Sequence, residues 1–347
     1  MPFANLPSTP LPNPGETLTS CTDDVRGAYA RVFEVQQHSS AMKEKLYARI
    51  LGYLLINLDR FSHTLGENPL TYVSREINRP LCDGKRIGSV VSTLGSLYLQ
   101  LFGAFLHQEP RPIIRDDSFD GSTKKLALIR DGFRCLATST IDDPYGTQSD
   151  SLATLARAGT SANETQPCHI FGNLTDCDHE CRTSTMNNIL SNFGLAIQDD
   201  LQNRGNVHDI RNILTLKTEC RIYFDQLEIW FEPTVTNHEY EIYYAQEWRQ
   251  QSLRLHDTVT FKVHDFVFAN TVDLIETMKR NPHEYLPDPK LLALHATCAR
   301  VAHMSGAAEL LQQWDLDLED KGVLASDGSD MDVFSHAMSK LFSVTVH

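Results

Sequence analysis

The chain has 347 residues, of which 41% are hydrophobic, and its formal net charge is −14. That charge excludes broad nonspecific attraction to a polyanion, so a nucleic-acid role would depend on a local basic patch. No apolar run reaches the roughly 18 residues that span a bilayer, no secretory signal is visible, and the cysteines lack regular paired spacing. We therefore expect an intracellular protein with reduced thiols and no membrane segment.

The first third of the chain predicts a leader and a helical lobe. Residues 1–20 are rich in Pro, Ser, Thr and Asn without apolar periodicity, which predicts a disordered leader. Residues 21–110 predict a helical N-terminal lobe, because apolar side chains recur at helical spacing, with breaks expected at Pro69 and Pro80. Prolines, acidic residues and a glycine then indicate a linker near residues 108–122.

The pattern of apolar and polar residues over 120–265 predicts short strands mixed with helices. Strands are expected at 133–137 and 168–171, and helices at 151–158 and 184–201. Two alternating patterns predict a half-buried strand and its partner: Leu227, Ile229 and Phe231, then Tyr240, Ile242 and Tyr244.

Residues 266–347 predict a helical C-terminal extension. It contains a long helix from Pro289 to about Leu316 and a final helix over residues 331–342. His295, Cys298 and His303 lie in the long helix among small residues, which indicates close helix packing rather than a ligand set.

Four short motifs follow one another in the middle of the chain. Residues 130–135 read Arg-Asp-Gly-Phe-Arg-Cys, residues 168–170 Cys-His-Ile, residues 212–216 Asn-Ile-Leu-Thr-Leu, and residues 224–225 Phe-Asp. In this order the motifs resemble those of the HNH (His-Asn-His) nuclease family, in particular the HNH proteins abundant in filamentous fungi. The resemblance implies an α+β fold, with a small ββα-metal core between the helical N-terminal and C-terminal lobes. It also implies metal-assisted hydrolysis of a phosphodiester.

The resemblance assigns the catalytic roles to His169 and Asn212. A histidine with a pKa near neutrality can take the proton of an attacking water, so His169 would be the general base. The amide of Asn212 both accepts and donates hydrogen bonds, which suits it to fixing the loop that carries that base. A divalent metal, Mg, Mn or Zn, would neutralise the charge that grows on the phosphate.

The family's second histidine, three residues before Phe-Asp, is replaced by Arg221. A guanidinium has no lone pair for a metal, so Arg221 is no ligand. The candidate metal ligands are then Cys168, Cys220 and Asp225, although thiolates suit zinc better than magnesium. Arg221 itself would either clamp a phosphate with paired N–H groups or pair with Asp225 one helical turn later.

Candidate substrate-binding residues are Arg134, Arg211 and Arg221, and the expected partner is nucleic acid, DNA rather than RNA. They belong to two groups of basic residues around the motifs, which alternatively are solvated charges answered by nearby acids. The first group is Lys124, Lys125, Arg130 and Arg134, and the second is Arg204, Arg211 and Arg221.

A second cluster, Asp-Cys-Asp-His-Glu-Cys at residues 176–181, crowds two thiols and an imidazole together. Cys177, His179 and Cys181 supply at most three of the four ligands that structural zinc requires. The alternative is a polar loop with incidental thiols.

Three hypotheses of function follow from these patterns. The first is a metal-dependent HNH endonuclease that uses His169. The second is a catalytically degenerate relative that binds nucleic acid through its arginines. The third is a protein-interaction scaffold in which the motif survives only as packing.

Overall fold

A computed structural model describes residues 10–79, 87–106, 121–146, 148–171, 188–195, 209–265, 268 and 271–309. The expected zinc cluster at 176–181, most of the expected linker at 108–122 and the expected final helix at 331–342 lie outside these residues. The fold is a mixture of helices and small sheets, as the α+β expectation requires. Within the described residues, no helix is long and apolar enough to cross a membrane.

The chain divides into two compact units that differ from the three expected lobes. The first comprises residues 1–104, 173–196 and 297–347, and the second comprises residues 105–172 and 197–296. Helix α14 (Pro289–Ser305) contributes residues to both units. The units are therefore discontinuous in sequence, which a scan for linkers does not reveal.

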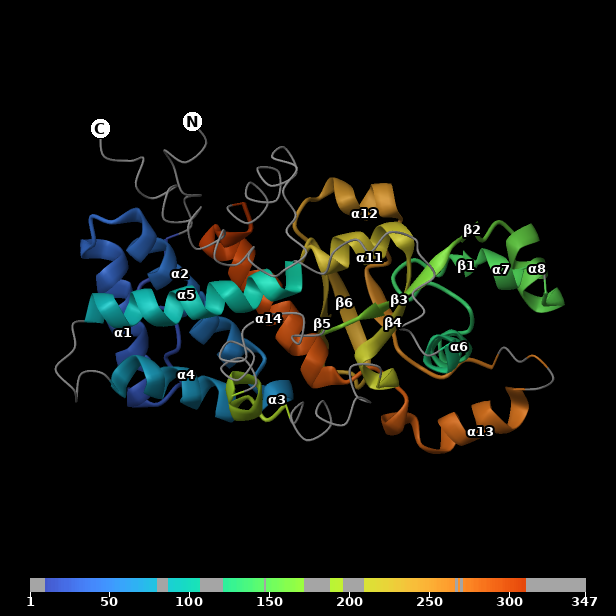
Figure 1. Cartoon of the computed structure of the whole chain (residues 1–347), viewed down its shortest axis with the longest axis horizontal. Helices are drawn as coiled ribbons and strands as arrows, with labels where there is room; N and C mark the ends of the chain where they lie inside the picture. Colours follow the sequence, from blue (N-terminus) through green and yellow to red (C-terminus); the bar gives the residue numbers. More distant parts are fainter. Residues whose placement is uncertain are drawn as a thin grey trace, which may run out of the picture. The chain divides into compact units, whose positions relative to one another are not determined.

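The first unit is helical, as its apolar spacing predicts (Figure 1). Leu46, Ile50, Leu51, Leu54 and Leu55 are all buried along one helix. The helices are α1 (Asp23–His38), α2 (Met42–Arg60), α3 (Ser62–Leu65), α4 (Asn68–Asn78) and α5 (Ile87–Leu106).

The described part of the leader corrects the expectation of disorder. The backbone N–H of the buried Leu11 donates to Gln36 Oε1 at 2.8 Å. The hydroxyl of Tyr29 donates to the carbonyl oxygen of Pro12 at 2.7 Å, and that of Tyr53 donates to Pro10 at 3.0 Å. Residues 10–12 are thus held by side chains of α1 and α2, because buried hydroxyls need partners and the leader's backbone supplies them.

The predicted helix boundaries are partly confirmed in the first unit and in α14, which both units share. Pro69 lies in the first turn of α4, where proline is tolerated because its missing N–H has no intrahelical partner, and Pro80 lies outside the described residues. Helix α14 begins at Pro289 as predicted but ends at Ser305, because Gly306 adopts a φ of +86°. His295 and Cys298 are buried, as expected of packing residues.

The second unit combines three small sheets with short helices (Figure 1). Strands β1 (Ile141–Asp142) and β2 (Ala162–Asn163) are parallel, and β3 (Thr165–His169) and β4 (Ile213–Lys217) are antiparallel. Antiparallel strands β5 (Ile229–Pro233), β6 (Glu239–Tyr244) and β7 (Thr258–Thr260) form the third sheet. The helices are α6 (Gly121–Arg130), α7 (Asp143–Gly146), α8 (Asp150–Arg157), η3 (Ile210–Asn212), α11 (Thr218–Asp225), α12 (Trp248–Leu253), α13 (Val272–Arg280) and η5 (Pro282–Glu284).

Two strands predicted in this unit require correction. Residues 133–137 form no strand, because Phe133 adopts positive φ and a turn follows Cys135, and only an isolated antiparallel bridge joins Arg134 to Ile141. Strand β3 begins at Thr165 and ends at His169, three residues before the predicted start and two before the predicted end. The helix predicted at 151–158 is confirmed by α8. Residues 188–192 of the helix predicted at 184–201 are also helical, and they belong to the first unit.

The predicted pair of alternating strands is confirmed by β5 and β6, where Phe231 pairs with Ile242. Strand β5 is not half-buried, however, because Trp230 and Glu232 on its other face are buried too. The indole N–H of Trp230 donates to Glu232 Oε1 at 2.8 Å, which satisfies the buried carboxylate. The alternation of polar and apolar residues wrongly predicts an exposed face here, because the polar Glu232 has a hydrogen-bond partner in the protein interior.

Candidate functional site

Strands β3 and β4 pair with each other, and helix α11 contacts both of them. The two strands pair with Cys168 opposite Leu214 and His169 opposite Ile213, and α11 starts directly after β4. Helix α11 contacts both strands and shares one hydrophobic core with Cys168, Leu214 and Leu216, and with β5 and β6. Three of the four motifs thus form a single β-β-α assembly within the second unit.

Asn212 holds the segment that follows His169. Its side-chain Oδ1 accepts from the backbone N–H of Phe171 at 2.9 Å, and its Nδ2 donates to the carbonyl oxygen of Phe171 at 2.9 Å. The backbone N–H of Ile170 also donates to the carbonyl oxygen of Asn212 at 2.8 Å. The amide is buried, so these bonds are shielded from water and fix the end of β3 against the start of β4.

His169 is the last residue of β3 and is half-buried. Gln166 and Cys168, whose side chains contact residues of α11, lie on one face of β3. Because successive side chains of a strand point to opposite faces, His169 starts from the face opposite α11. The strand and the Asn212 hydrogen bonds to the next two residues fix its backbone.

Arg221 is held between β3 and its own helix. Its Nη1 donates to Gln166 Oε1 at 2.9 Å, and its Nε lies 3.4 Å from Asp225 Oδ2 one turn later. The ion pair predicted between Arg221 and Asp225 is confirmed, and the arginine side chain is 26% exposed. The position at which the sequence resemblance expects a metal-binding histidine thus carries a partly solvated positive charge.

The buried carboxylate of Asp225 is shared between that arginine and a thiol. Cys168 Sγ donates to Asp225 Oδ1 at 3.4 Å. Burial raises the pKa of Asp225 to about 6, even though the charge of Arg221 acts to lower it. Burial, together with the charge of Asp225, raises the pKa of Cys168 well above that of a free thiol, so this cysteine stays protonated.

Cys220 lies in the core beside Cys135 of the first motif. A hydrogen bond to Cys135, followed by burial, raises the pKa of Cys220, so its thiol stays protonated. Burial acts to raise the pKa of Cys135 as well, but hydrogen bonds from Cys220, Thr138 and the backbone outweigh it and lower that pKa to about 6. A metal-binding thiolate at Cys220 would have to break this pair.

The three candidate metal ligands are engaged with other side chains. Cys168 donates to Asp225, Cys220 is paired with Cys135, and Asp225 is paired with the guanidinium of Arg221. Hard cations such as magnesium require several ionised or carbonyl oxygens around one point. Among the described residues, no three His, Cys, Asp or Glu side chains are grouped to hold a metal.

Arg130 of the first motif is structural, which corrects its expected place in a basic patch. Its side chain is fully buried, and its Nε and Nη2 donate to the two oxygens of Asp131 at 2.6 and 2.7 Å. The remaining N–H groups donate to the carbonyl oxygens of Ile210, Ile213 and Tyr285 at 2.8 to 2.9 Å. This guanidinium hydrogen-bonds residues of η3, of β4 and of the end of η5 to α6, and its side chain is not exposed to solvent.

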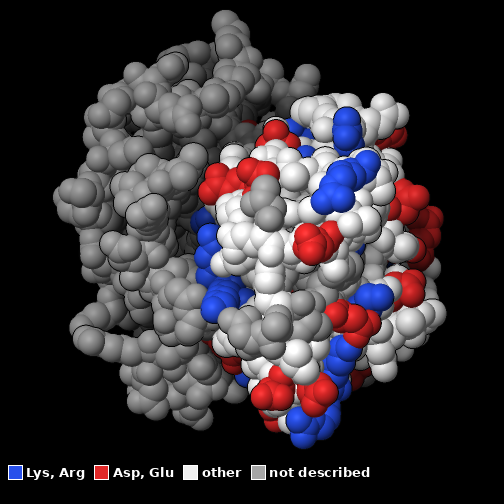
Figure 2. Space-filling view, turned by 90° about the vertical axis from the view of Figure 1, so that its right-hand side faces the viewer, with Lys and Arg blue, Asp and Glu red and all other residues white. Residues whose placement is uncertain are grey.

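Arg211 and Arg134, the candidate substrate-binding residues besides Arg221, lie elsewhere in the second unit. Arg211 pairs with Asp209 at 2.7 Å, directly before Asn212. Arg134 lines a cavity to which neither Arg211 nor Arg221 contributes. The alternative of answered charges holds for Arg211 and Arg221, because each is paired with an aspartate, while Arg204 lies outside the described residues. Figure 2 shows basic and acidic side chains interleaved on the visible face.

Two residues to which the sequence assigned no role take part in this site: Gln166, which lies outside the motifs, and Cys135, the last residue of the first motif. Gln166 fixes Arg221, and Cys135 fixes Cys220. Gln166 lies two residues before Cys168 on the same face of β3, so the spacing was a usable signal once the strand was placed correctly. Comparison of the chain with protein families, curated proteins and solved structures finds no match in any of the three.

Proposed function

We propose that the β3–β4–α11 assembly is an HNH-type ββα module that binds nucleic-acid phosphates and whose capacity to cut them is reduced or lost. One observation carries the proposal: Asn212 locks the segment after His169 while Arg221 stands on the helix, where the family places a metal ligand. The order strand, strand, helix, with the histidine ending the first strand, is the order that the family resemblance implies.

Arg221 is suited to contact a phosphate directly. Its bonds to Gln166 and Asp225 use two of its five N–H donors and hold the guanidinium in one orientation. A preorganised planar fork loses less entropy on binding phosphate than a free side chain does. Such a contact would be partly offset by Asp225, so its strength depends on the protonation of that carboxyl.

The binding proposal is tested by fluorescence anisotropy with a labelled DNA duplex at low salt. We expect Arg221→Gln to weaken binding about tenfold, because a charge-assisted hydrogen bond contributes about 1.5 to 3 kcal/mol. Arg157→Gln is the matched control, since this arginine is exposed on α8, and it should bind as the wild type does. Equal affinities for all three proteins would exclude Arg221 as a phosphate contact.

A second candidate, an active endonuclease, is favoured by the retained His169 and its Asn212 support. A plasmid-nicking assay with Mg, Mn or Zn separates the two. We expect little nicking by the wild type and a gain of metal-dependent nicking in Arg221→His, which the further change His169→Ala abolishes. Strong wild-type nicking that is lost in His169→Ala would select the endonuclease over the binding module.

A further inference from the structure

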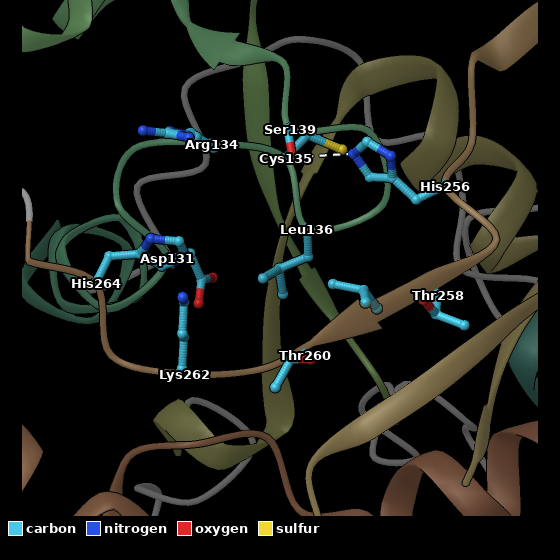
Figure 3. A pocket seen from close by; sticks show the side chains of 11 residues that line it. Asp131, Arg134, Cys135, Leu136, Ser139, His256, Thr258, Thr260, Lys262 and His264 are labelled. Carbon is cyan, nitrogen blue, oxygen red and sulfur yellow. Dashed lines mark hydrogen bonds between the residues drawn. The ribbon is translucent and has the colours of Figure 1, made fainter. Parts of the chain in front are cut away.

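The second unit contains a cavity of about 310 Å³ between the first motif and the chain around β7. Such a volume lies at the lower end of the range of small-molecule pockets. The residues that line it come from the motif turn and from the chain around β7 (Figure 3): Asp131, Arg134, Cys135, Leu136, Ser139, His256, Thr258, Val259, Thr260, Lys262 and His264. His169, Asn212 and Arg221 are not among them, so this cavity is separate from the site described above.

The charged side chains around the cavity are mostly basic. Arg134, Lys262, His256 and His264 line it, and Asp131 is the only carboxylate among the described residues of the lining. Both oxygens of Asp131 already accept hydrogen bonds from the buried Arg130, and Oδ2 also accepts from the backbone N–H of Thr215. A chain with a net charge of −14 therefore presents a locally positive cavity.

The basic groups lie close to one another. Burial lowers the pKa of His264, with Asp131 acting to raise it and the charges of Arg134 and Lys262 acting to lower it. Figure 3 shows Lys262 and His264 on one side of the cavity and His256 with Ser139 on another. His256 Nε2 lies 2.9 Å from the hydroxyl oxygen of Ser139, so these two side chains orient each other.

The backbone of the first motif, at Gly132, determines how His264 packs on one side of the cavity. Gly132 has a φ of +66°, and a Cβ atom there would lie 2.8 Å from Cβ and Cγ of His264. Only glycine therefore lets His264 pack over the turn. The backbone N–H of His264 also donates to the carbonyl oxygen of Arg130 at 3.1 Å, which ties the histidine to the same buried guanidinium residue.

We propose that this cavity binds the phosphate group of a small phosphate monoester. A phosphate carries several strong acceptor oxygens, and the lining offers ammonium, guanidinium, imidazole and hydroxyl donors together. A carboxylate has fewer acceptors to engage donors on opposite sides of the cavity. The volume suits a compact ligand rather than a nucleic-acid strand, and the inference does not depend on the proposed function of the β3–β4–α11 assembly.

Isothermal titration of the full chain with adenosine 5′-monophosphate tests the proposal, with adenosine as the probe that lacks the phosphate. We expect the monophosphate to bind and adenosine not to bind. Lys262→Ala should weaken binding about tenfold, because it removes one charge-assisted contact from an exposed residue without disturbing the core. His256→Gln, a second exposed position, should weaken it as well.

Lys290→Ala is the control of equal charge change, because Lys290 is exposed on α14 and is not part of the cavity lining. It should bind as the wild type does, and so should His169→Ala, which separates this site from the phosphodiester site. Absence of phosphate-dependent binding, or an equal loss in Lys290→Ala, would overturn the proposal. Tighter binding of a short unphosphorylated oligonucleotide, with the same dependence on Lys262, would overturn the assignment to a small monoester.

Discussion

At the scale of the residue, the partners of Arg221 and Asp225 decide their chemistry. The sequence allowed Asp225 to be a metal ligand or the partner of Arg221. The structure buries it against Cys168 and pairs it with Arg221. Because burial acts more strongly on its pKa than the ion pair does, the carboxyl titrates near pH 6 rather than near its ordinary value of about 4.

This raised pKa predicts how stability depends on pH. Between about pH 4 and pH 6 the folded chain holds a proton on Asp225 that the unfolded chain has lost, so this group's stabilising contribution is lost as pH rises through about 6. Asp225→Asn cannot titrate. Relative to the wild type, its free energy of unfolding should rise by up to about 3 kcal/mol between pH 4 and pH 8, at about 1.4 kcal/mol per pKa unit.

The measurement is urea unfolding of both proteins at several pH values, followed by tryptophan fluorescence, to which Trp230 and Trp248 of the second unit contribute. Comparing the two proteins cancels the titration of the chain's 14 histidines. A constant difference between them across the pH range would show that Asp225 has an ordinary pKa in the folded chain.

At the scale of the element, buried polar side chains join the short strands and helices of the second unit. Strands of two to six residues have little stability of their own. Arg130 offers its N–H groups to three carbonyl oxygens from separate segments, and Asn212 joins the end of β3 to η3. The Arg-Asp-Gly-Phe-Arg-Cys motif is thus first a means of assembling these elements.

We predict that Arg130→Met lowers the free energy of unfolding by about 3 to 5 kcal/mol, because it leaves Asp131 as a buried charge without its partner. Arg157→Met, at an exposed arginine on α8, should change it by less than about 0.5 kcal/mol. Urea unfolding followed by tryptophan fluorescence measures both. A loss at Arg130 no greater than at Arg157 would contradict the structural role.

At the scale of the whole molecule, the net charge and the pairing of the arginines limit the surface that could bind the proposed nucleic acid. The net charge is −14, and acidic and basic groups are interleaved on the face seen in Figure 2. Arg211 is paired with Asp209, and Arg221 with Asp225. The proposed binding of nucleic acid would therefore rest on a few local contacts, because the described residues show no broad positive surface on that face.

The predicted consequence is a shallow dependence of affinity on salt. With one or two phosphates neutralised, the logarithm of the association constant should fall with the logarithm of salt concentration with a slope of about −1 to −2. Arg221→Gln should reduce that slope by about one. Anisotropy titrations across a salt series give the slope, and a value steeper than about −5 would indicate an extended basic surface that the described residues do not show.

The sequence by itself determined the helical first unit, the β5–β6 pair and the start of α14, because each depends on neighbours in sequence, and it left the Arg221–Asp225 pair as one of two alternatives. Only the tertiary structure decided that Arg130 is buried, that two candidate ligands are protonated thiols, and that residues 10–12 are ordered. Those outcomes depend on groups far apart in the chain, whose approach sets burial, protonation and hydrogen-bond partners together. Local patterns specify an element's type, and packing specifies the chemistry of its side chains.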